Sequence, residues 1–369
     1  MRPQSIVFLT SHSALGGAQF LWSNIAEGFH KRGHEVQLVA LYPWSDPERE
    51  STPEHPWEYI VESRPKSLPK QIEMVRQLVA RIKRTQPDVI VTALPAANVL
   101  APLAAKLAGT GTKVVITHHS PAETHSRVLN YIDGYTGSLS NVKWVVSVSG
   151  AVSRSLDGKP KQYLPKRKVI YNALPPDIEK LLADLDKQHS PRSARGRKVV
   201  ATGRLAKQKN YPLLIRSAAH LPDVTFDIVG DGPDADALTG LATELNVTDR
   251  LNFLGHRQRE DALRVLAEGD IFAQVSLFEG HSLALVEAAK LGMPLIVSDS
   301  PVQIESVTAN DGTRCGIVVG MQDDRDLARQ ISNLLSDPSQ YQLWSERSRK
   351  LGAEATFHGV IDAYQELLV

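Results

Sequence analysis

Short apolar runs rich in β-branched residues alternate along this chain with longer stretches of helical periodicity. This alternation is typical of βαβ units and a parallel sheet. The first expected strands are Ser5–Thr10, Val36–Leu41, Val89–Ala93, Lys113–Thr117, Trp144–Ser149 and Lys168–Tyr171. The second series is Lys198–Gly203, Thr225–Gly230, Leu251–Leu254, Ile271–Val275, Pro294–Ser298 and Gly316–Val319. Helical patterns between them include Ala18–Lys31, Gln71–Thr85, Tyr211–His220, Asp234–Leu245, Arg259–Ala267 and Leu283–Leu291.

The two series predict an α/β protein with two Rossmann-like, doubly wound lobes. At 369 residues the chain exceeds the size at which one core keeps growing, which also favours two domains. The polar, Gly- and Pro-containing segment Pro175–Arg197 is the expected interdomain linker. Ligands of doubly wound sheets bind at the carboxyl ends of the strands, so we expect a site in a cleft between facing lobes.

Composition excludes several classes of protein. Lys and Arg number 42 against 41 Asp and Glu, so there is no strongly basic footprint for nucleic acid. The one cysteine, Cys315, allows no intrachain disulfide and no cysteine-based zinc cluster. The apolar run Ile6–Leu9 is too short for a secretory or membrane segment. We therefore expect a soluble protein of the reducing cytoplasm, with docking on a membrane surface left open.

The most informative stretch runs from Phe278 to Pro294 and contains Glu279 and Glu287. It follows a strand and opens a helix, whose first backbone amides have no acceptor and suit a phosphate. Those amides belong to Gly280, His281, Ser282 and Leu283. The alternative is that Glu279 caps the helix and Glu287 is a solvated helix residue.

A second stretch, Gly203 to Asn210, also lies between a strand and a helix. Arg204 offers a planar guanidinium fork and Lys209 a point charge, the side chains that neutralise a diphosphate. The alternative is an ordinary basic surface turn. Its position on the rim that carries Glu279 favours the phosphate contact.

Two glycine turns are weaker signals. Gly16 and Gly17 follow the first strand and would let backbone amides approach a ligand, although they could simply form a tight turn. Gly230 begins a Gly-x-Gly-x-x-Ala match that resembles a dinucleotide fingerprint. Pro233 removes an amide there, so a turn that supports the nucleotide site is the preferred interpretation.

His118 and His119 end the strand Lys113–Thr117, where an imidazole can bond sugar hydroxyls. With Glu123 and His125 they could also be a metal cluster, but the helical His-Glu-x-x-His spacing is missing. We expect no metal and no cofactor. The basic stretch Lys159–Lys168 is either a solvated loop or a contact for anionic lipid or an anionic acceptor.

Taken together, these residues resemble the family 4 retaining glycosyltransferases of the GT-B fold. The likeness covers nearly the whole chain, and its most specific part is the Glu-x7-Glu motif of Glu279 and Glu287. The other matching segments are Gly16-Gly17, the Thr-x-His that ends at His119, Ser147–Ser149, Tyr171-Asn172, Gly203–Leu205 with Lys209-Asn210, Val229–Pro233 and Phe253–Gly255.

The resemblance implies a role for each matched position. Glu279 would contact the donor sugar and Glu287 the ribose, while Arg204 and Lys209 would hold the diphosphate. His119 would lie near the transferred sugar, with the neighbouring His118 leaving the choice of active histidine open. The backbone around Arg257 would meet the base, His281 stands where an aromatic residue is common, and Ser149 and Asn172 would shape the cleft.

The resemblance also implies the division of labour. Residues 1–174 with 355–369 would bind the acceptor, since the C-terminal helix Phe357–Leu368 would return to the first lobe, and residues 175–354 would bind the nucleotide-sugar. The expected reaction is metal-independent, retaining transfer of a hexose-type sugar from UDP- or GDP-sugar to a glycan, glycolipid or small-molecule hydroxyl. Polysaccharide assembly at the inner membrane face is the expected setting. A nucleotide-sugar epimerase or phosphorylase, or a non-catalytic sugar-nucleotide sensor, is the alternative.

Overall fold

The computed structural model describes residues 2–14, 17–44, 55–189, 193 and 196–368 of the chain. These residues divide into two compact units, Met1–Asn172 with His358–Val369 and Ala173–Phe357. The sequence places the boundaries after residues 174 and 354. Each unit is described by itself.

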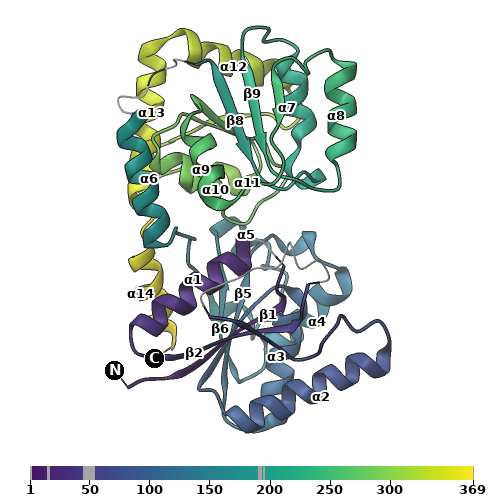
Figure 1. Cartoon of the computed structure of the whole chain (residues 1–369). Helices are drawn as coiled ribbons and strands as arrows, with labels where there is room; N and C mark the ends of the chain where they lie inside the picture. The colour runs from purple at the N-terminus through teal and green to yellow at the C-terminus, as the bar shows by residue number, and fades with distance from the viewer. Residues whose placement is uncertain (1, 15–16, 45–54, 190–192, 194–195, 369) are drawn as a thin grey trace. The chain divides into compact units, whose positions relative to one another are not determined.

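The first unit is built on a parallel sheet with the order β3-β2-β1-β4-β5-β6-β7 in its described part (Figure 1). Its strands are β1 Ser5–His12, β2 Glu35–Tyr42, β3 Trp57–Tyr59, β4 Val89–Ala93, β5 Lys113–His118, β6 Val142–Ser147 and β7 Arg167–Val169. Its helices are α1 Gly17–Lys31, α2 Leu68–Thr85, α3 Pro95–Ala108, α4 Arg127–Gly137, α5 Gly150–Arg154 and α14 Phe357–Leu368.

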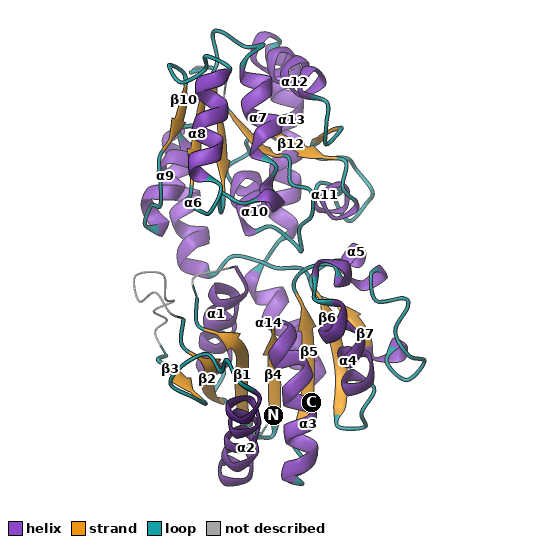
Figure 2. Ribbon diagram, turned by 90° about the vertical axis from the view of Figure 1, so that its right-hand side faces the viewer, coloured by secondary structure: helices purple, strands orange, loops and turns teal. Residues whose placement is uncertain are grey.

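Helices cover both faces of this sheet, which is why its central strands are mostly apolar and buried. All five residues of β4 are buried. In Figure 2, α2, α3 and α4 lie on one face, where side chains of α2 and α3 join the core beneath β1 and β2. On the other face, the Trp22 ring of α1 packs edge-on against Phe8, with centroids 5.8 Å apart.

The C-terminal helix α14 belongs to the first unit. The ring of its Tyr364 meets Trp22 at a centroid distance of 6.0 Å. Asp362 accepts a 2.6 Å ion-paired hydrogen bond from Arg32 at the end of α1. The last helix of the chain therefore completes the core formed by the first segments, as the resemblance implies.

The second unit has a parallel sheet with the order β10-β9-β8-β11-β12-β13 in its described part. Its strands are β8 Lys198–Thr202, β9 Thr225–Val229, β10 Leu251–Phe253, β11 Ile271–Gln274, β12 Leu295–Ser298 and β13 Ile317–Val319. Its helices are α6 Pro176–His189, α7 Tyr211–Ala218, α8 Ala235–Glu244, α9 Arg259–Ala267, α10 Leu283–Lys290, α11 Pro301–Ser306, α12 Asp324–Ser336 and α13 Pro338–Glu354. The two sheets confirm the doubly wound α/β fold.

The expected linker Pro175–Arg197 is wrong for most of its length. Residues Pro176–His189 form α6, and its side chains Ile178, Leu182 and Leu185 are buried in the second unit. Pro176 begins this helix, with Asp177 and Glu179 in its first turn, where carboxylates complement the helix dipole. The prolines that suggest a linker are therefore the start signal of a helix.

The elements of the first unit that are missing from the expected series include β3 and α3. The short edge strand β3 has one buried residue, Trp57, so it shows no alternating pattern. Helix α3 contains Pro102, which argues against a helix by propensity, but its alanine-rich face packs into the core. Tertiary packing decides both elements.

Candidate functional site

The strand order of the second unit reverses between β8 and β11. In an open parallel sheet, ligands bind beyond the carboxyl ends of the strands at such a switch point. The loop after β8 carries Arg204 and Lys209, and the loop after β11 carries Glu279. The two most informative stretches of the sequence therefore meet at one place.

Direct bonds join these two loops. The Lys209 ammonium lies 2.8 Å from Oε1 of Glu279, and both side chains are largely buried. The Gln208 side chain donates to the Phe278 backbone carbonyl at 3.1 Å. The backbone carbonyl of Gln208 accepts from the Leu277 backbone amide at 2.8 Å. Glu279 also accepts from Gln274 at 3.0 Å. The carboxylate is thus held in a fixed orientation.

Glycines bring a second turn against the Arg204 loop. Gly230, after β9, has φ +144°, and a Cβ there would lie 2.0 Å from the carbonyl oxygen of Gly203. A Cβ on Gly232 would lie 2.3 Å from the Leu205 carbonyl oxygen. The Gly203 amide donates to Val229, and the Leu205 amide donates to Asp231. Gly230 therefore supports the loop that presents Arg204.

The cationic rim of this site is open. Arg204 is exposed, and the structure gives its guanidinium no partner among the described residues. Arg257, which follows β10, is also exposed. Both side chains are free to turn toward an anionic ligand at this edge of the sheet.

Helix α10 begins beside Glu279. Ser282 is its N-cap residue, and the Ser282 carbonyl accepts the first helical hydrogen bond from Val286. The amides of the first turn have no acceptor within a helix, and they carry the positive end of its dipole. The segment Gly280 to Leu283 therefore lies where an anion would be stabilised.

Two titratable groups lie in and beside α10, the buried Glu287 and the half-buried His281. Burial raises the pKa of Glu287, and the neighbouring Arg259 guanidinium opposes that shift. Arg259 of α9 donates to the Glu287 carboxylate. Burial lowers the pKa of His281 to about 4, although the Glu305 carboxylate opposes this. The carboxylate of Glu287 is therefore fixed by a partner rather than solvated.

In the first unit, the predicted residues follow the carboxyl ends of β1, β5, β6 and β7. Gly16 lies outside the described residues. Gly17 begins α1 and is exposed, and a Cβ there would meet nothing within 4 Å. Space around Gly17 therefore does not by itself require a glycine.

The structure distinguishes the two neighbouring histidines. His119 is half-buried, and its Nε2 lies 2.8 Å from the Thr117 hydroxyl. That hydroxyl donates its proton to the Thr92 carbonyl at 2.6 Å, so Nε2 of His119 must be the donor and Nδ1 is left as an acceptor. Burial lowers the pKa of His119 to about 3. His119 is a neutral imidazole at the end of β5.

His118 belongs to a buried polar network instead. Its Nε2 lies 2.8 Å from the Tyr163 hydroxyl, which donates to Asp133 at 3.0 Å. Burial lowers the pKa of His118 to about 4, against the opposing effect of Asp133. Lys159 is 2.7 Å from Asp133 and completes the network. Of the two histidines, His119 is the one with an exposed part.

Ser149 and Asn172 have structural positions at the same edge. The buried Ser149 is the N-cap of α5, and its hydroxyl accepts from the Val152 amide at 3.2 Å. Asn172 is buried as well and follows β7. Ser149 therefore caps the start of α5 at this edge.

Several partners of the site residues are absent from the sequence predictions. They are Gln208 and Gln274 on Glu279, Arg259 on Glu287, and Tyr163 with Asp133 on His118. Gln208 adjoins Lys209 in its loop, and Gln274 is five residues before Glu279 at the end of β11. The other partners come from distant segments that only the folded chain brings together.

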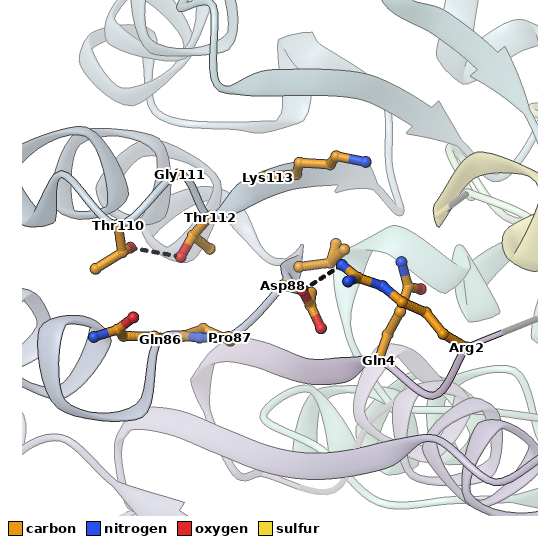
Figure 3. A pocket seen from close by; sticks show the side chains of 10 residues that line it. Arg2, Gln4, Gln86, Pro87, Asp88, Thr110, Gly111, Thr112 and Lys113 are labelled. Atoms are coloured by element: carbon orange, nitrogen blue, oxygen red, sulfur yellow. Dashed lines mark hydrogen bonds and ion pairs between the residues drawn. The ribbon is translucent and has the colours of Figure 1, made fainter.

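A polar cavity of about 360 Å³ lies elsewhere in the first unit (Figure 3). Arg2, Asp88, Thr112 and Lys113 help to line it, at the amino ends of β1, β4 and β5. It contains none of the predicted site residues. Because ligands of doubly wound sheets bind at the opposite edge, this cavity is not the candidate site.

The described ranges contain neither a candidate metal cluster nor a helix that could span a membrane. No three His, Cys, Asp or Glu side chains there form a group that could hold a metal ion. No helix in those same ranges is long and apolar enough to cross a bilayer.

Comparison with known proteins fits this architecture. Residues 15–178 match the model "Glycosyltransferase Family 4", and residues 183–351 match "Glycosyl transferases group 1". Anabaena HepE, solved in complex with UDP and glucose, shares 20% identity at a TM-score of 0.79 over 99% of each chain. Sucrose-phosphate synthase of Thermosynechococcus elongatus gives a TM-score of 0.79 at 18% identity, over 99% of this chain and 98% of that one.

Curated relatives share more sequence over shorter regions. A lipopolysaccharide core biosynthesis glycosyltransferase, LpsE of Rhizobium meliloti, is 30% identical over 46% of this chain and 49% of its own length. An Escherichia coli UDP-Gal:alpha-D-GlcNAc-diphosphoundecaprenol alpha-1,3-galactosyltransferase is 30% identical over 63% of each chain. The matched region therefore covers 49% of the length of the first relative and 63% of the length of the second.

Two Rossmann-like units with charged loops at a strand switch point define the GT-B class of protein. Since one family model matches most of the first unit and the other most of the second, this chain belongs to the family 4 glycosyltransferases.

Proposed function

We propose that this chain transfers a hexose-type sugar from a UDP- or GDP-sugar to a hydroxyl of a glycan, glycolipid or small-molecule acceptor. Transfer would retain the anomeric configuration and need no metal. The observation that carries the proposal is the junction of the Lys209 and Glu279 loops beside the start of α10. This junction combines cationic side chains, helix-end amides and a fixed carboxylate.

The diphosphate would lie against the exposed guanidinium of Arg204 and the first-turn amides of α10. As the sugar–phosphate bond breaks, negative charge grows on the leaving diphosphate. Preorganised donors stabilise that charge without reorganising, and loss of one such donor typically costs on the order of 10²-fold or more in rate. Arg204, Lys209 and the α10 amides would supply the charge that a metal supplies elsewhere.

Glu279 and Glu287 would recognise hydroxyl groups. An ionised carboxylate is an acceptor with several lone-pair positions, and Lys209 and Gln274 leave part of Glu279 available. We assign Glu279 to the donor sugar and Glu287 to the ribose. The backbone near Arg257 would meet the base.

His119 would face the transferred sugar. Its Nδ1 is a neutral acceptor for a sugar hydroxyl, because Nε2 donates to Thr117. The acceptor hydroxyl would enter on the face from which the diphosphate leaves. Excluding water from that face would limit hydrolysis of the donor.

Two similar proteins support this proposal. HepE was solved with UDP-glucose, and the E. coli relative acts on a diphosphoundecaprenol-linked acceptor. By analogy with these two proteins, we infer that this chain uses a nucleotide-sugar donor and a glycan or glycolipid acceptor. A setting at the inner face of the cell membrane would follow from such an acceptor.

A thermal-shift panel of nucleoside diphosphates and their sugars tests the donor, because a ligand of the folded state raises its melting temperature by mass action. The stabilising donor is then incubated with and without acceptors, and the products are separated. We expect transfer only when an acceptor is present. Isomerised sugar without acceptor would indicate an epimerase, and sugar 1-phosphate formed with inorganic phosphate a phosphorylase. Binding without turnover of any acceptor would indicate a sensor.

A further inference from the structure

Exposed large apolar side chains are unevenly distributed over the described residues. Ten of the eleven lie in the first unit, and the exception is Leu343 in α13. Five lie within residues 127–171, on α4 and around the edge strand β7. This local density points to an interaction surface rather than to scattered exposure.

Helix α4 presents three of these side chains as one stripe. Val128, Tyr131 and Tyr135 are 66%, 67% and 57% exposed, and their spacing places them on one face of the helix. The two tyrosine hydroxyls are 2.8 Å apart, and the rings meet edge-on. Valine is apolar, and each tyrosine has an apolar ring with a polar hydroxyl at its tip. This combination suits a water–lipid interface.

A basic loop is bound to the same helix. Lys159 donates to the carboxamide oxygen of Asn130, and Lys166 donates to the Gly137 carbonyl at 2.9 Å. A Cβ on Gly134 would lie 3.0 Å from Pro160, so loop and helix are in close contact. The exposed Lys161 is part of this loop.

The charge of this region is strongly positive. Residues 127–168 contain eight Lys and Arg but only two Asp and Glu. Both carboxylates are already paired, Asp133 with Lys159 and Asp157 with Arg167. The whole first unit has 21 Lys and Arg against 15 Asp and Glu, whereas the second has 21 against 26. The charge asymmetry favours an anionic partner on the first unit.

The inner face of α4 connects this surface to the end of β5. Asp133, on the side of the helix opposite the stripe, binds Tyr163, which contacts His118. A Cβ on Gly137 would lie 2.3 Å from the Tyr163 ring, so the helix is pressed against this network. His118, which ends this network, is followed in the chain by His119. A ligand carried on the outer face of α4 would therefore be positioned through a rigid path to the candidate active edge.

We propose that the stripe Val128, Tyr131 and Tyr135, with the basic loop 159–168, docks this protein on an anionic membrane surface. The tyrosines and the valine would enter the headgroup region, and lysines such as Lys161 would meet lipid phosphates. Such binding combines buried apolar area with attraction to anionic lipid. As a consequence that rests on the proposed function, the acceptor would be anchored in that membrane.

Vesicle co-sedimentation of the full chain tests this directly. The vesicles contain either phosphatidylcholine alone or equal parts of phosphatidylcholine and phosphatidylglycerol. We expect sedimentation with the anionic vesicles, little with the neutral ones, and release at high salt. The double variant Tyr131→Ser/Tyr135→Ser should weaken partitioning about tenfold or more, and Lys161→Glu should weaken it in the anionic vesicles.

Leu343→Ser is the matched control, since it removes an exposed apolar side chain from the second unit, and it should sediment as the wild type does. Tyr131→Trp/Tyr135→Trp should keep or raise binding, which separates loss of the surface from loss of folding. Wild-type protein that stays in the supernatant, or a serine variant that binds fully, would overturn the proposal. So would a wild-type dimer that the serine variant dissociates, because a second copy would then cover the stripe. Nucleoside diphosphate binding measured without vesicles is independent of this surface, so its failure would overturn the proposed function alone.

Discussion

The Nζ atom of Lys209 lies 2.8 Å from Oε1 of Glu279, and this ion pair joins the loops that follow β8 and β11. The pair serves two roles, because it fixes a buried carboxylate and brings a cation to the switch point of the sheet. Its energetic and functional contributions can be separated by substitution.

Lys209→Met should lower the free energy of unfolding by about 3 kcal/mol, because it leaves the Glu279 carboxylate buried without its cation. The double variant Lys209→Met/Glu279→Gln should recover most of that loss, since the remaining group is neutral and still has Gln208 and Gln274 beside it. Urea unfolding measures both changes. Transfer activity should stay low in the single and double variants. A double variant with restored activity would show that the pair is only structural.

Gly230→Ala should destabilise the second unit by roughly 3 kcal/mol, since its Cβ would lie 2.0 Å from the Gly203 carbonyl oxygen at φ +144°. The Arg204 loop would shift as a result, and nucleotide binding should weaken. Gly240→Ala is the matched control, because nothing lies within 4 Å of its Cβ and it sits inside α8. That control should gain about 1 kcal/mol. Equal melting temperatures for the two variants would refute the close approach of the turns.

Histidines whose pKa is lowered should make stability depend on pH, and the neighbouring pair of buried His118 and half-buried His119 is a clear case. The pKa of His119 is lowered to about 3 and that of His118 to about 4 by burial, below the unfolded value of about 6.5. As pH falls below about 6.5, the unfolded chain therefore takes up protons that the folded chain does not. Each histidine contributes stability that is fully present above about pH 6.5 and lost at up to about 1.4 kcal/mol per pH unit below it.

Urea unfolding at pH 7, 6 and 5 measures this slope. His119→Gln should reduce the slope by the contribution of one histidine, which is up to about 1.4 kcal/mol per pH unit. The glutamine carboxamide can still donate to Thr117. A wild-type slope that is flat over this range would contradict neutral imidazoles at His118 and His119.

Most of the fold follows from local patterns. Buried strands such as β4 and the strong amphipathic helix α2 are readable because their periodicity agrees with their final packing. The segment around Pro176 is misread because proline both interrupts and begins helices. Helix α3 is missed because its Pro102 is tolerated only in the folded context. In both cases tertiary packing outweighs the local signal.

The candidate site divides in a similar way. Arg204, Lys209 and Glu279 stand out from the sequence because each follows a strand, and strand ends share an edge. Their supporting partners do not stand out. Tyr163 reaches His118 from 45 residues away, so the choice between the two histidines depends on a contact that no local pattern records. The stripe Val128, Tyr131 and Tyr135 on α4 can be recognised only when the exposure of these side chains is known.

The central claim is that the switch point of the second unit holds a nucleoside diphosphate, and calorimetric titration tests it most directly. UDP and GDP are titrated into wild-type protein, Arg204→Ala and Lys207→Ala. Lys207 is an exposed lysine of the same loop and serves as the control. At least one nucleotide should bind the wild type and Lys207→Ala with similar Kd, and Arg204→Ala should weaken it about tenfold or more while melting at the wild-type temperature. Absence of binding to the wild type, or equal Kd for Arg204→Ala, would contradict the account.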